Sequence, residues 1–132
     1  MEEIQSYIHR HQLQAQITIL EEVSNEELPA IYQQAKLFVF PSHFEGFGIP
    51  IIEAMCSGVP VITTDKPCFR DAGGAAALYV ENSEDSIRQA ITEVLGNVDL
   101  QQEMIAKGEE HVRRFDRAKV ISDLLRLYEG LV

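Results

Sequence analysis

The feature that most constrains the fold is a pair of short apolar segments separated by one helix-length stretch. The segment Leu37-Phe38-Val39-Phe40 is apolar at every position and stops at Pro41, and Val59 to Thr63 is a second strand-like segment. A strand that is apolar at every position fits a sheet covered on both faces. Two such strands joined through a helix are expected to pair in parallel. The sequence therefore predicts an α/β fold.

The same alternation extends along the whole chain, whose 132 residues suffice for one domain. Strands are predicted at residues 17–20, 37–40, 59–63 and 77–80, and helices at 2–12, 24–35, 50–57, 84–95, 99–115 and 117–129. A capping box from Ser24 to Glu27 opens the second helix, Gly58 ends the third, and Gly108 is expected to break the fifth. Residues 64–76 are predicted to form a loop. The expected fold class is a Rossmann-like parallel sheet of about four strands with helices on both faces.

Charge and composition exclude several classes of partner. The chain holds 11 Lys and Arg against 21 Asp and Glu, a formal net charge of −10. Binding to nucleic acid or to an anionic membrane needs a basic stripe or patch, so neither partner is expected. No apolar run approaches the roughly 20 residues of a membrane span, and the acidic N-terminus is unlike a secretory signal. A cytoplasmic location is expected, with the inner face of the membrane as the alternative for a full-length protein.

The sequence offers no pattern for a metal or a resident cofactor. Cys56 and Cys68 are the only cysteines and form no C-x-x-C pair, and the four histidines show no H-E-x-x-H spacing. A D-x-D pair, which could hold a metal and a nucleotide-sugar, is also missing. We therefore expect a reducing compartment and no bound metal or cofactor.

The candidate site is the stretch from Pro41 to Gly58, PSHFEGFGIPIIEAMCSG. It follows the carboxyl end of a strand, where open α/β sheets bind ligands. Gly46 and Gly48 let the backbone turn sharply, and the next helix directs N–H groups and partial positive charge at the same place. Glu45 precedes the glycines, and Glu53 is expected in the first turn of the helix. Taken singly, the glycines could only make a turn, and Glu53 could only stabilise the helix dipole.

Together these residues resemble the signature of retaining GT-B glycosyltransferases of family 4. That signature has two glutamates separated by seven residues, with G-F-G-x-P between them and E-A-M-x-x-G-x-P-V at its end. The matching positions are Glu45, Gly46, Phe47, Gly48, Pro50, Glu53, Ala54, Met55, Gly58, Pro60 and Val61. The segments LPAIYQQAKLFVFPS, FRDAGGAAALYV and Leu127-Tyr128 are similar to the family as well. The resemblance therefore covers essentially the whole chain.

The resemblance implies a nucleoside-diphosphate sugar as donor substrate and a glycan or lipid-linked acceptor. Glu53 would accept hydrogen bonds from ribose hydroxyls, a role that suits an ionised carboxylate. Glu45 would contact the donor hexose near the reacting centre as the catalytic residue, and the amides of Gly46 to Ile49 would bind the sugar and the pyrophosphate. Such an enzyme transfers a hexose with retention by stabilising the leaving diphosphate and an oxocarbenium-like sugar, without a metal.

The chain departs from the family pattern at several points. Asp71 stands where the family usually has Glu, Ala75 where it has Asp, and His43 has no role to carry over. The family also has a separate N-terminal acceptor domain and two earlier strands, whose G-R and K-G elements neutralise the pyrophosphate. Residues 1–132 are thus expected to be part of a donor-binding domain that transfers no sugar in isolation.

The family's strand order would place one of those earlier strands beside residues 37–40. Without it, this apolar segment becomes the edge of the sheet, and such an edge readily pairs with another chain. Either residues 17–20 pair with it, or two copies of the chain associate through it. We expect self-association.

Two other functions are compatible with parts of the sequence. One is a regulatory module that binds nucleotide-sugars without turnover. The other is a signalling receiver domain, because VPVITTDKP is similar to strands of that class. A receiver needs a phosphoacceptor Asp at the end of a middle strand, where this chain has Pro41-Ser42. The receiver hypothesis is therefore disfavoured.

Overall fold

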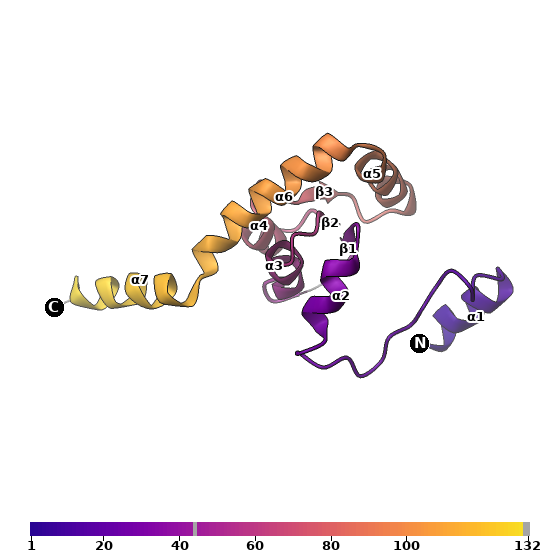
Figure 1. Ribbon diagram of the computed structural model, residues 1–132, viewed down its shortest axis with the longest axis horizontal. Helices are drawn as coiled ribbons and strands as arrows, with labels where there is room; N and C mark the ends of the chain where they lie inside the picture. The colour runs from indigo at the N-terminus through magenta and orange to yellow at the C-terminus, as the bar shows by residue number, and fades with distance from the viewer. Residues whose placement is uncertain (44, 131–132) are drawn as a thin grey trace.

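The computed structural model describes residues 1–43 and 45–130. The elements in chain order are α1 (Glu2–Arg10), α2 (Leu28–Gln34), β1 (Phe38–Phe40), α3 (Ile49–Cys56), β2 (Val61–Thr64), α4 (Pro67–Gly73), β3 (Leu78–Val80), α5 (Glu84–Gly96), α6 (Val98–Val112), the 3-10 turn η1 (Arg113–Phe115) and α7 (Arg117–Glu129). The sheet and helices α2 to α6 form a central body, and α1 and α7 extend from opposite sides of it (Figure 1). No helix within the described residues is long and apolar enough to cross a membrane.

The sheet is parallel throughout, in the order β1-β2-β3. The first residues of β1 and β2, Phe38 and Val61, pair with each other. The first residue of β3, Leu78, pairs with Ile62 of β2. Helices lie between successive strands and cover both faces, which confirms the predicted α/β class. Within the described residues β1 is an edge of the sheet, as predicted.

The expected number of strands was wrong, because residues 17–20 form no strand. Ile17 and Leu20 are 42% and 56% exposed and lie in an extended segment between α1 and α2. β-branched residues favour a strand because they pack on a pleated surface, and this segment has no such surface beside it. It does not pair with β1, so the first of the two expected partners for that edge is excluded.

The core forms two layers, one on each face of the sheet. Alternate residues of β2 point to opposite faces, so Val61 joins one apolar cluster and Ile62 the other. The first cluster includes Ile51 of α3 and Phe69 of α4. The second includes Val94 of α5 and Met104 of α6. This packing places α3, which follows the candidate loop, against the sheet.

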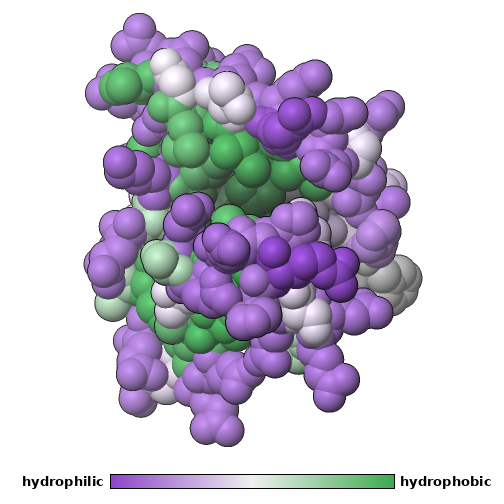
Figure 2. Space-filling model, turned by 90° about the vertical axis from the view of Figure 1, so that its right-hand side faces the viewer, coloured by the Kyte–Doolittle hydropathy of each residue, from purple (hydrophilic) through white to green (hydrophobic). Residues whose placement is uncertain are grey.

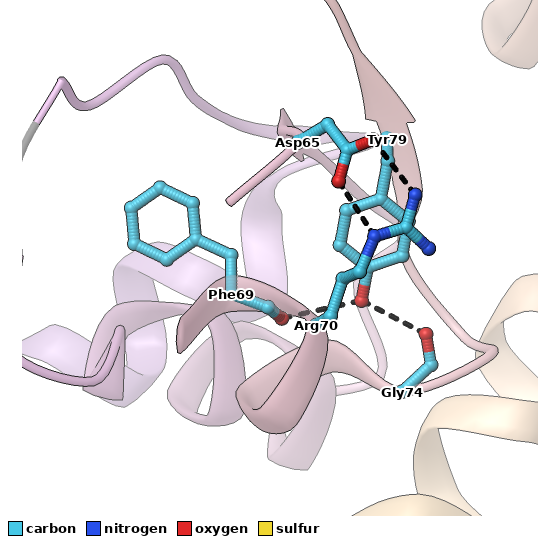
Figure 3. A network of polar contacts seen from close by, with 5 residues as sticks. All are labelled: Asp65, Phe69, Arg70, Gly74 and Tyr79. Atoms are coloured by element: carbon cyan, nitrogen blue, oxygen red, sulfur yellow. Dashed lines mark hydrogen bonds and ion pairs between the residues drawn. The ribbon is translucent and has the colours of Figure 1, made fainter. Parts of the chain in front are cut away.

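Helix α4 occupies residues that were predicted to be a loop (Figure 3). A side chain outside the helix stabilises its last turn and its C-cap: the single O–H of Tyr79 on β3 is shared between the carbonyls of Gly74, at 2.8 Å, and Phe69, at 3.2 Å. Arg70 donates two hydrogen bonds to Asp65 and lies 4.7 Å from the Tyr79 ring centroid. Burial raises the pKa of Tyr79 to about 12, with the Asp65 and Asp71 charges adding to the rise and Arg70 opposing it.

The predicted boundaries of the other helices are mostly confirmed. Ser24 and Glu27 exchange the hydrogen bonds of a capping box, but they do so in the turn before α2, which begins at Leu28, so the predicted start at residue 24 was wrong. Gly58 has a φ of +73° just after α3, as expected for a glycine that ends a helix. Gly108 was wrongly expected to break a helix. It lies buried within α6, where a Cβ would come 3.3 Å from Met55, so its small size allows α6 to approach α3.

Candidate functional site

The candidate loop begins at the carboxyl end of β1 and is anchored by the neighbouring strand. Thr63 Oγ1 donates to the carbonyl of Phe40 at 2.9 Å, and Thr64 Oγ1 donates to that of Ser42 at 3.0 Å. Both threonines are buried, so these hydrogen bonds fix the direction in which the chain leaves the sheet. Ser42 Oγ in turn donates to Glu45 Oε1 at 3.2 Å. Glu45 is exposed at the opening of the loop.

Gly48 is the glycine that the loop requires. Its φ is +97°, and a Cβ there would lie 3.1 Å from both Ile51 and Phe69. It is also the N-cap of α3, so the loop turns directly into the helix. The first turn of a helix leaves N–H groups without an acceptor inside the helix, and Pro50 has no N–H to contribute. The Ile49 amide is therefore the first helical donor beside the loop.

Glu53 lies one residue further along α3 than predicted, just beyond its first turn. The helix begins at Ile49, so Glu53 is its fifth residue and is outside the first turn. The half-buried side chain faces α2, where the Tyr32 hydroxyl donates to Glu53 Oε2 at 3.3 Å. Burial, followed by the Glu53 charge, raises the pKa of Tyr32 to about 12. Ser57 Oγ donates to the Glu53 carbonyl at 2.9 Å and so supports this turn of the helix.

A groove of about 430 Å³ separates α2 from α3, and we call it the α2–α3 groove. It is lined by Asn25, Leu28, Pro29, Tyr32, Gln33, Ile52, Glu53, Cys56 and Ser57. Leu28 and Ile52 give it apolar walls, while Glu53 and the amides of Asn25 and Gln33 supply polar groups. This combination fits a flat ring with a polar edge and attached hydroxyl groups.

The structure thus divides the predicted site residues between two places. Glu53 lines the α2–α3 groove, and none of residues 45–49 is among the groove's lining. Glu45, Gly46 and Phe47 are exposed on the loop instead. The sequence analysis missed Tyr32. The spacing of Tyr32 from Leu28 shows that they share a face of α2, but only the packing of α2 on α3 brings that face to Glu53.

The remaining residues singled out in the sequence lie around these two places. His43 is exposed and lies 3.1 Å from the Asn82 side-chain amide, which confirms it as a surface residue of the loop. Cys56 and Cys68 are free thiols, and burial together with the Glu53 charge raises the pKa of the Cys56 thiol. In the described part of the chain, no three His, Cys, Asp or Glu side chains cluster in a way that could hold a metal ion.

Comparison with protein families gives one extended match. The family model described as "Glycosyl transferases group 1" matches residues 1–111. The O-antigen chain mannosyltransferase RfbU of Salmonella typhimurium is 38% identical over 105 residues, which are 80% of this chain and 29% of that protein. A phosphatidyl-myo-inositol mannosyltransferase of Mycobacterium leprae is 32% identical over 117 residues, 86% of this chain and 31% of that protein. The chain therefore spans about a third or less of the length of these relatives.

Solved structures show the same arrangement of elements. A sucrose-phosphate synthase from Thermosynechococcus elongatus superposes with a TM-score of 0.84 at 25% identity, over 98% of this chain and 34% of that one. The pneumococcal O-GlcNAc transferase GtfA, solved with UDP and GlcNAc, superposes with a TM-score of 0.76 at 23% identity, over 98% of this chain and 27% of that one. Both neighbours are GT-B glycosyltransferases, so the fold agrees with the resemblance seen in the sequence.

Proposed function

Because the chain belongs to the glycosyl transferases group 1 family, we propose that it binds the nucleoside-diphosphate-sugar donor of a retaining hexosyltransferase. The acceptor would be a glycan or a lipid-linked glycan. Relatives described as O-antigen and phosphatidyl-myo-inositol mannosyltransferases support both a hexose and this kind of acceptor. A cytoplasmic site of action, at the inner face of the membrane for a lipid-linked acceptor, goes with this proposal.

The observation that carries the proposal is the position of Glu53 in the α2–α3 groove. One of its oxygens, Oε2, accepts from Tyr32, and a carboxylate keeps further acceptor capacity on both oxygens. Ribose offers two neighbouring hydroxyl donors that a carboxylate can bind together. The groove beside Glu53 has apolar walls and amide groups, which suit the attached base. The nucleoside therefore belongs in this groove.

The sugar and the diphosphate belong at the loop that precedes α3. The amides of Gly46 to Ile49 and the positive end of the α3 dipole stabilise negative charge there without a metal. Glu45 lies at the opening of the same loop, where its Oε1 accepts a hydrogen bond from Ser42 Oγ. In this arrangement Glu45 contacts the hexose as the catalytic residue, and Glu53 holds the nucleoside at the other side of the site.

Donor binding by the 132-residue chain is expected to be weak, because the net charge of −10 opposes an anionic ligand. We also propose that this chain alone transfers no sugar, since transfer requires an acceptor held in position for attack. The test is a titration of the chain with GDP-, UDP- and ADP-linked hexoses, followed by NMR or calorimetry. Saturable binding of one of them is the expected result, and no binding of any would contradict the proposal. Sugar transfer by the purified chain would contradict only the proposal that the chain alone is inactive, and not the proposal that it binds the donor.

Turnover and binding assays on a longer protein that contains this chain distinguish the hexosyltransferase hypothesis from the regulatory-module hypothesis. Turnover of a donor that the chain binds supports the hexosyltransferase. Donor binding without turnover, with acceptors of the glycan and lipid-linked classes present, supports a nucleotide-sugar-binding module instead.

A further inference from the structure

The ring of Phe47 makes an aromatic contact far along the chain. Phe47 is the residue between the two glycines of the candidate loop, and its side chain is 39% exposed. Its ring lies edge-to-face against Phe115 of η1, with the centroids 5.8 Å apart and the planes at 80°. This is the preferred geometry of an aromatic pair. The loop is therefore in contact with the segment that joins α6 to α7.

Phe115 is itself held in place by neighbours on α6 and on η1. The ring of His111 lies edge-on to it at 5.5 Å, and the guanidinium of Arg114 lies 5.4 Å from its centroid. His111 Nε2 lies 2.9 Å from the carbonyl of Ala72 in α4, and since a carbonyl only accepts, Nε2 is the donor. A chain of contacts thus runs from α4 through His111 and Phe115 to Phe47.

Two features of α4 and its C-cap residue Gly74 tie this chain of contacts to the loop. A Cβ on Gly74 would overlap the His111 ring, so the absence of a side chain at residue 74 makes room for the imidazole. The same helix places Phe69 and Ala72 directly behind Gly48. The loop is therefore supported at Gly48 by α4 and at Phe47 by Phe115, which α4 supports through His111.

We propose that Phe115 is a positioning residue for the donor site, which fixes the conformation of loop residues 46–49 through its contact with Phe47. Glycines on both sides give Phe47 wide backbone freedom, and ordering such a segment costs conformational entropy when a ligand binds. An aromatic contact that holds the loop before binding lowers that cost. The inference rests on the proposed function, because it assigns the sugar to the amides of this loop.

The test uses Phe115→Leu, which keeps most of the side-chain volume and removes the ring. Affinities are measured for the hexose-linked nucleotide that binds the wild-type chain best and for the matching nucleoside, which lacks both the diphosphate and the sugar. An aromatic pair contributes about 0.5–1.5 kcal/mol, so the affinity for the sugar-bearing ligand should fall about twofold to tenfold. The nucleoside contacts only the α2–α3 groove in this account, so its affinity should change less. Amide hydrogen exchange at residues 46, 47, 48 and 49 should become faster in the unliganded variant.

Three further variants show whether the effect passes through Phe47. Phe47→Leu should lose as much affinity as Phe115→Leu, and the double variant should lose no more than either, since both remove one contact. Phe115→Tyr retains the ring and should bind as the wild type does. Tyr128→Ala removes an exposed ring from α7 and serves as the control for the loss of an aromatic residue.

Each outcome bears on one of the two proposals. The positioning role of Phe115 would be overturned if the affinity losses of Phe47→Leu and Phe115→Leu added up in the double variant. It would also be overturned if both ligands lost affinity equally, or if amide hydrogen exchange of the loop did not change. The proposal of donor binding would still stand. Failure of the wild-type chain to bind either ligand would overturn the proposed function. Loop exchange in Phe115→Leu would then still show whether Phe115 orders the loop.

Discussion

The hydroxyl of Tyr32 donates a hydrogen bond to Oε2 of Glu53 at 3.3 Å, which connects two helices on either side of the α2–α3 groove. Tyr32 is 8% exposed, and its ring lies edge-on to Phe38 of β1 at 5.2 Å. The sheet therefore supports Tyr32, and Tyr32 orients the carboxylate. A glutamate held in this way needs less ordering when a ligand binds to its other oxygen.

Tyr32→Phe tests the energetic part of this relationship. The ring contact with Phe38 is kept and one hydrogen bond is lost, so the free energy of unfolding should fall by about 0.5–1.5 kcal/mol. Denaturant unfolding followed by circular dichroism measures the change. The matched control is Tyr128→Phe on the exposed face of α7, which should stay within about 0.5 kcal/mol of the wild type. Equal stability of Tyr32→Phe and the wild type would show that this hydrogen bond contributes nothing.

Stability at high pH should depend on two tyrosines. Burial raises the pKa of Tyr32 and of Tyr79 to about 12, above the value of 10 from which each is shifted. A pKa raised in the folded state means that the folded chain holds its proton more tightly, so the stabilisation is complete below pH 10. It should be lost as the pH rises from 10 through 12.

The measurement for this prediction is tyrosinate absorbance alongside the unfolding free energy between pH 8 and 12. Removing one phenol in Tyr79→Phe should make the loss of stability with pH less steep. A loss of the same steepness in Tyr79→Phe and the wild type would contradict the assignment. The test reports on burial of the phenols and does not depend on donor binding.

Gly74→Ala should destabilise the chain through a backbone strain and a clash. Gly74 has a φ of +53° and a ψ of −136°, a conformation that residues with a Cβ rarely adopt, and its Cβ would overlap His111. We expect a loss of about 1–3 kcal/mol in the free energy of unfolding. Gly96→Ala is the matched control. Gly96 is the last residue of α5, and a Cβ at this position would meet no atom within 4 Å.

A double variant separates the two contributions. His111→Ala removes the ring that the Cβ of residue 74 would meet, so Gly74→Ala should cost less in that background than in the wild type. The remaining cost reports the backbone strain alone. A cost that is the same in both backgrounds would show that His111 does not occupy the space beside Gly74.

The exposed edge of β1 leads to a prediction about association. Residues 17–20 leave this edge unpaired, and the strand has no charge or Pro to discourage pairing with a second copy. On the face seen from the α1 side, apolar side chains line a hollow bordered by polar ones (Figure 2). Sedimentation over a concentration series should show a rising mass, with amides of β1 gaining protection from exchange. A constant mass near 15 kDa would exclude association.

The elements of the central body could be predicted because their signals are local. Leu37 to Phe40 is apolar and Val59 to Thr63 is mostly apolar over the length of a strand, and Gly58 ends the helix between them. Residues 17–20 show the limit of such patterns, since their strand-like composition lacks a neighbouring strand. Helix α4 shows the converse: it begins at Pro67 and ends at Gly73, with Gly74 as its C-cap, yet it forms because the Tyr79 hydroxyl of a later strand bonds carbonyls of the helix and its cap.

For the candidate site, the sequence proposes residues but not the geometry in which they lie. Motif spacing singled out Glu45 and Glu53 as candidates, and only the packing of α3 on α2, with the Tyr32 hydrogen bond to Glu53, shows that Glu53 faces α2 and not the loop. The contributions of Tyr32 and Phe115 arise from contacts between elements distant in sequence, Tyr32 with Glu53 and Phe115 with Phe47. No periodicity or cap carries that information.

The central claim is that Glu53 holds the nucleoside and Glu45 the sugar of one donor. The most direct measurement is calorimetric affinity of Glu53→Gln and Glu45→Gln for a nucleoside diphosphate with and without its hexose. Glu53→Gln should weaken binding of both ligands by roughly 1.5–3 kcal/mol, since hydrogen bonds to a charged acceptor become bonds to an amide. Glu45→Gln should weaken binding of the sugar-bearing ligand alone. Unchanged affinity of Glu53→Gln for the diphosphate would contradict the account.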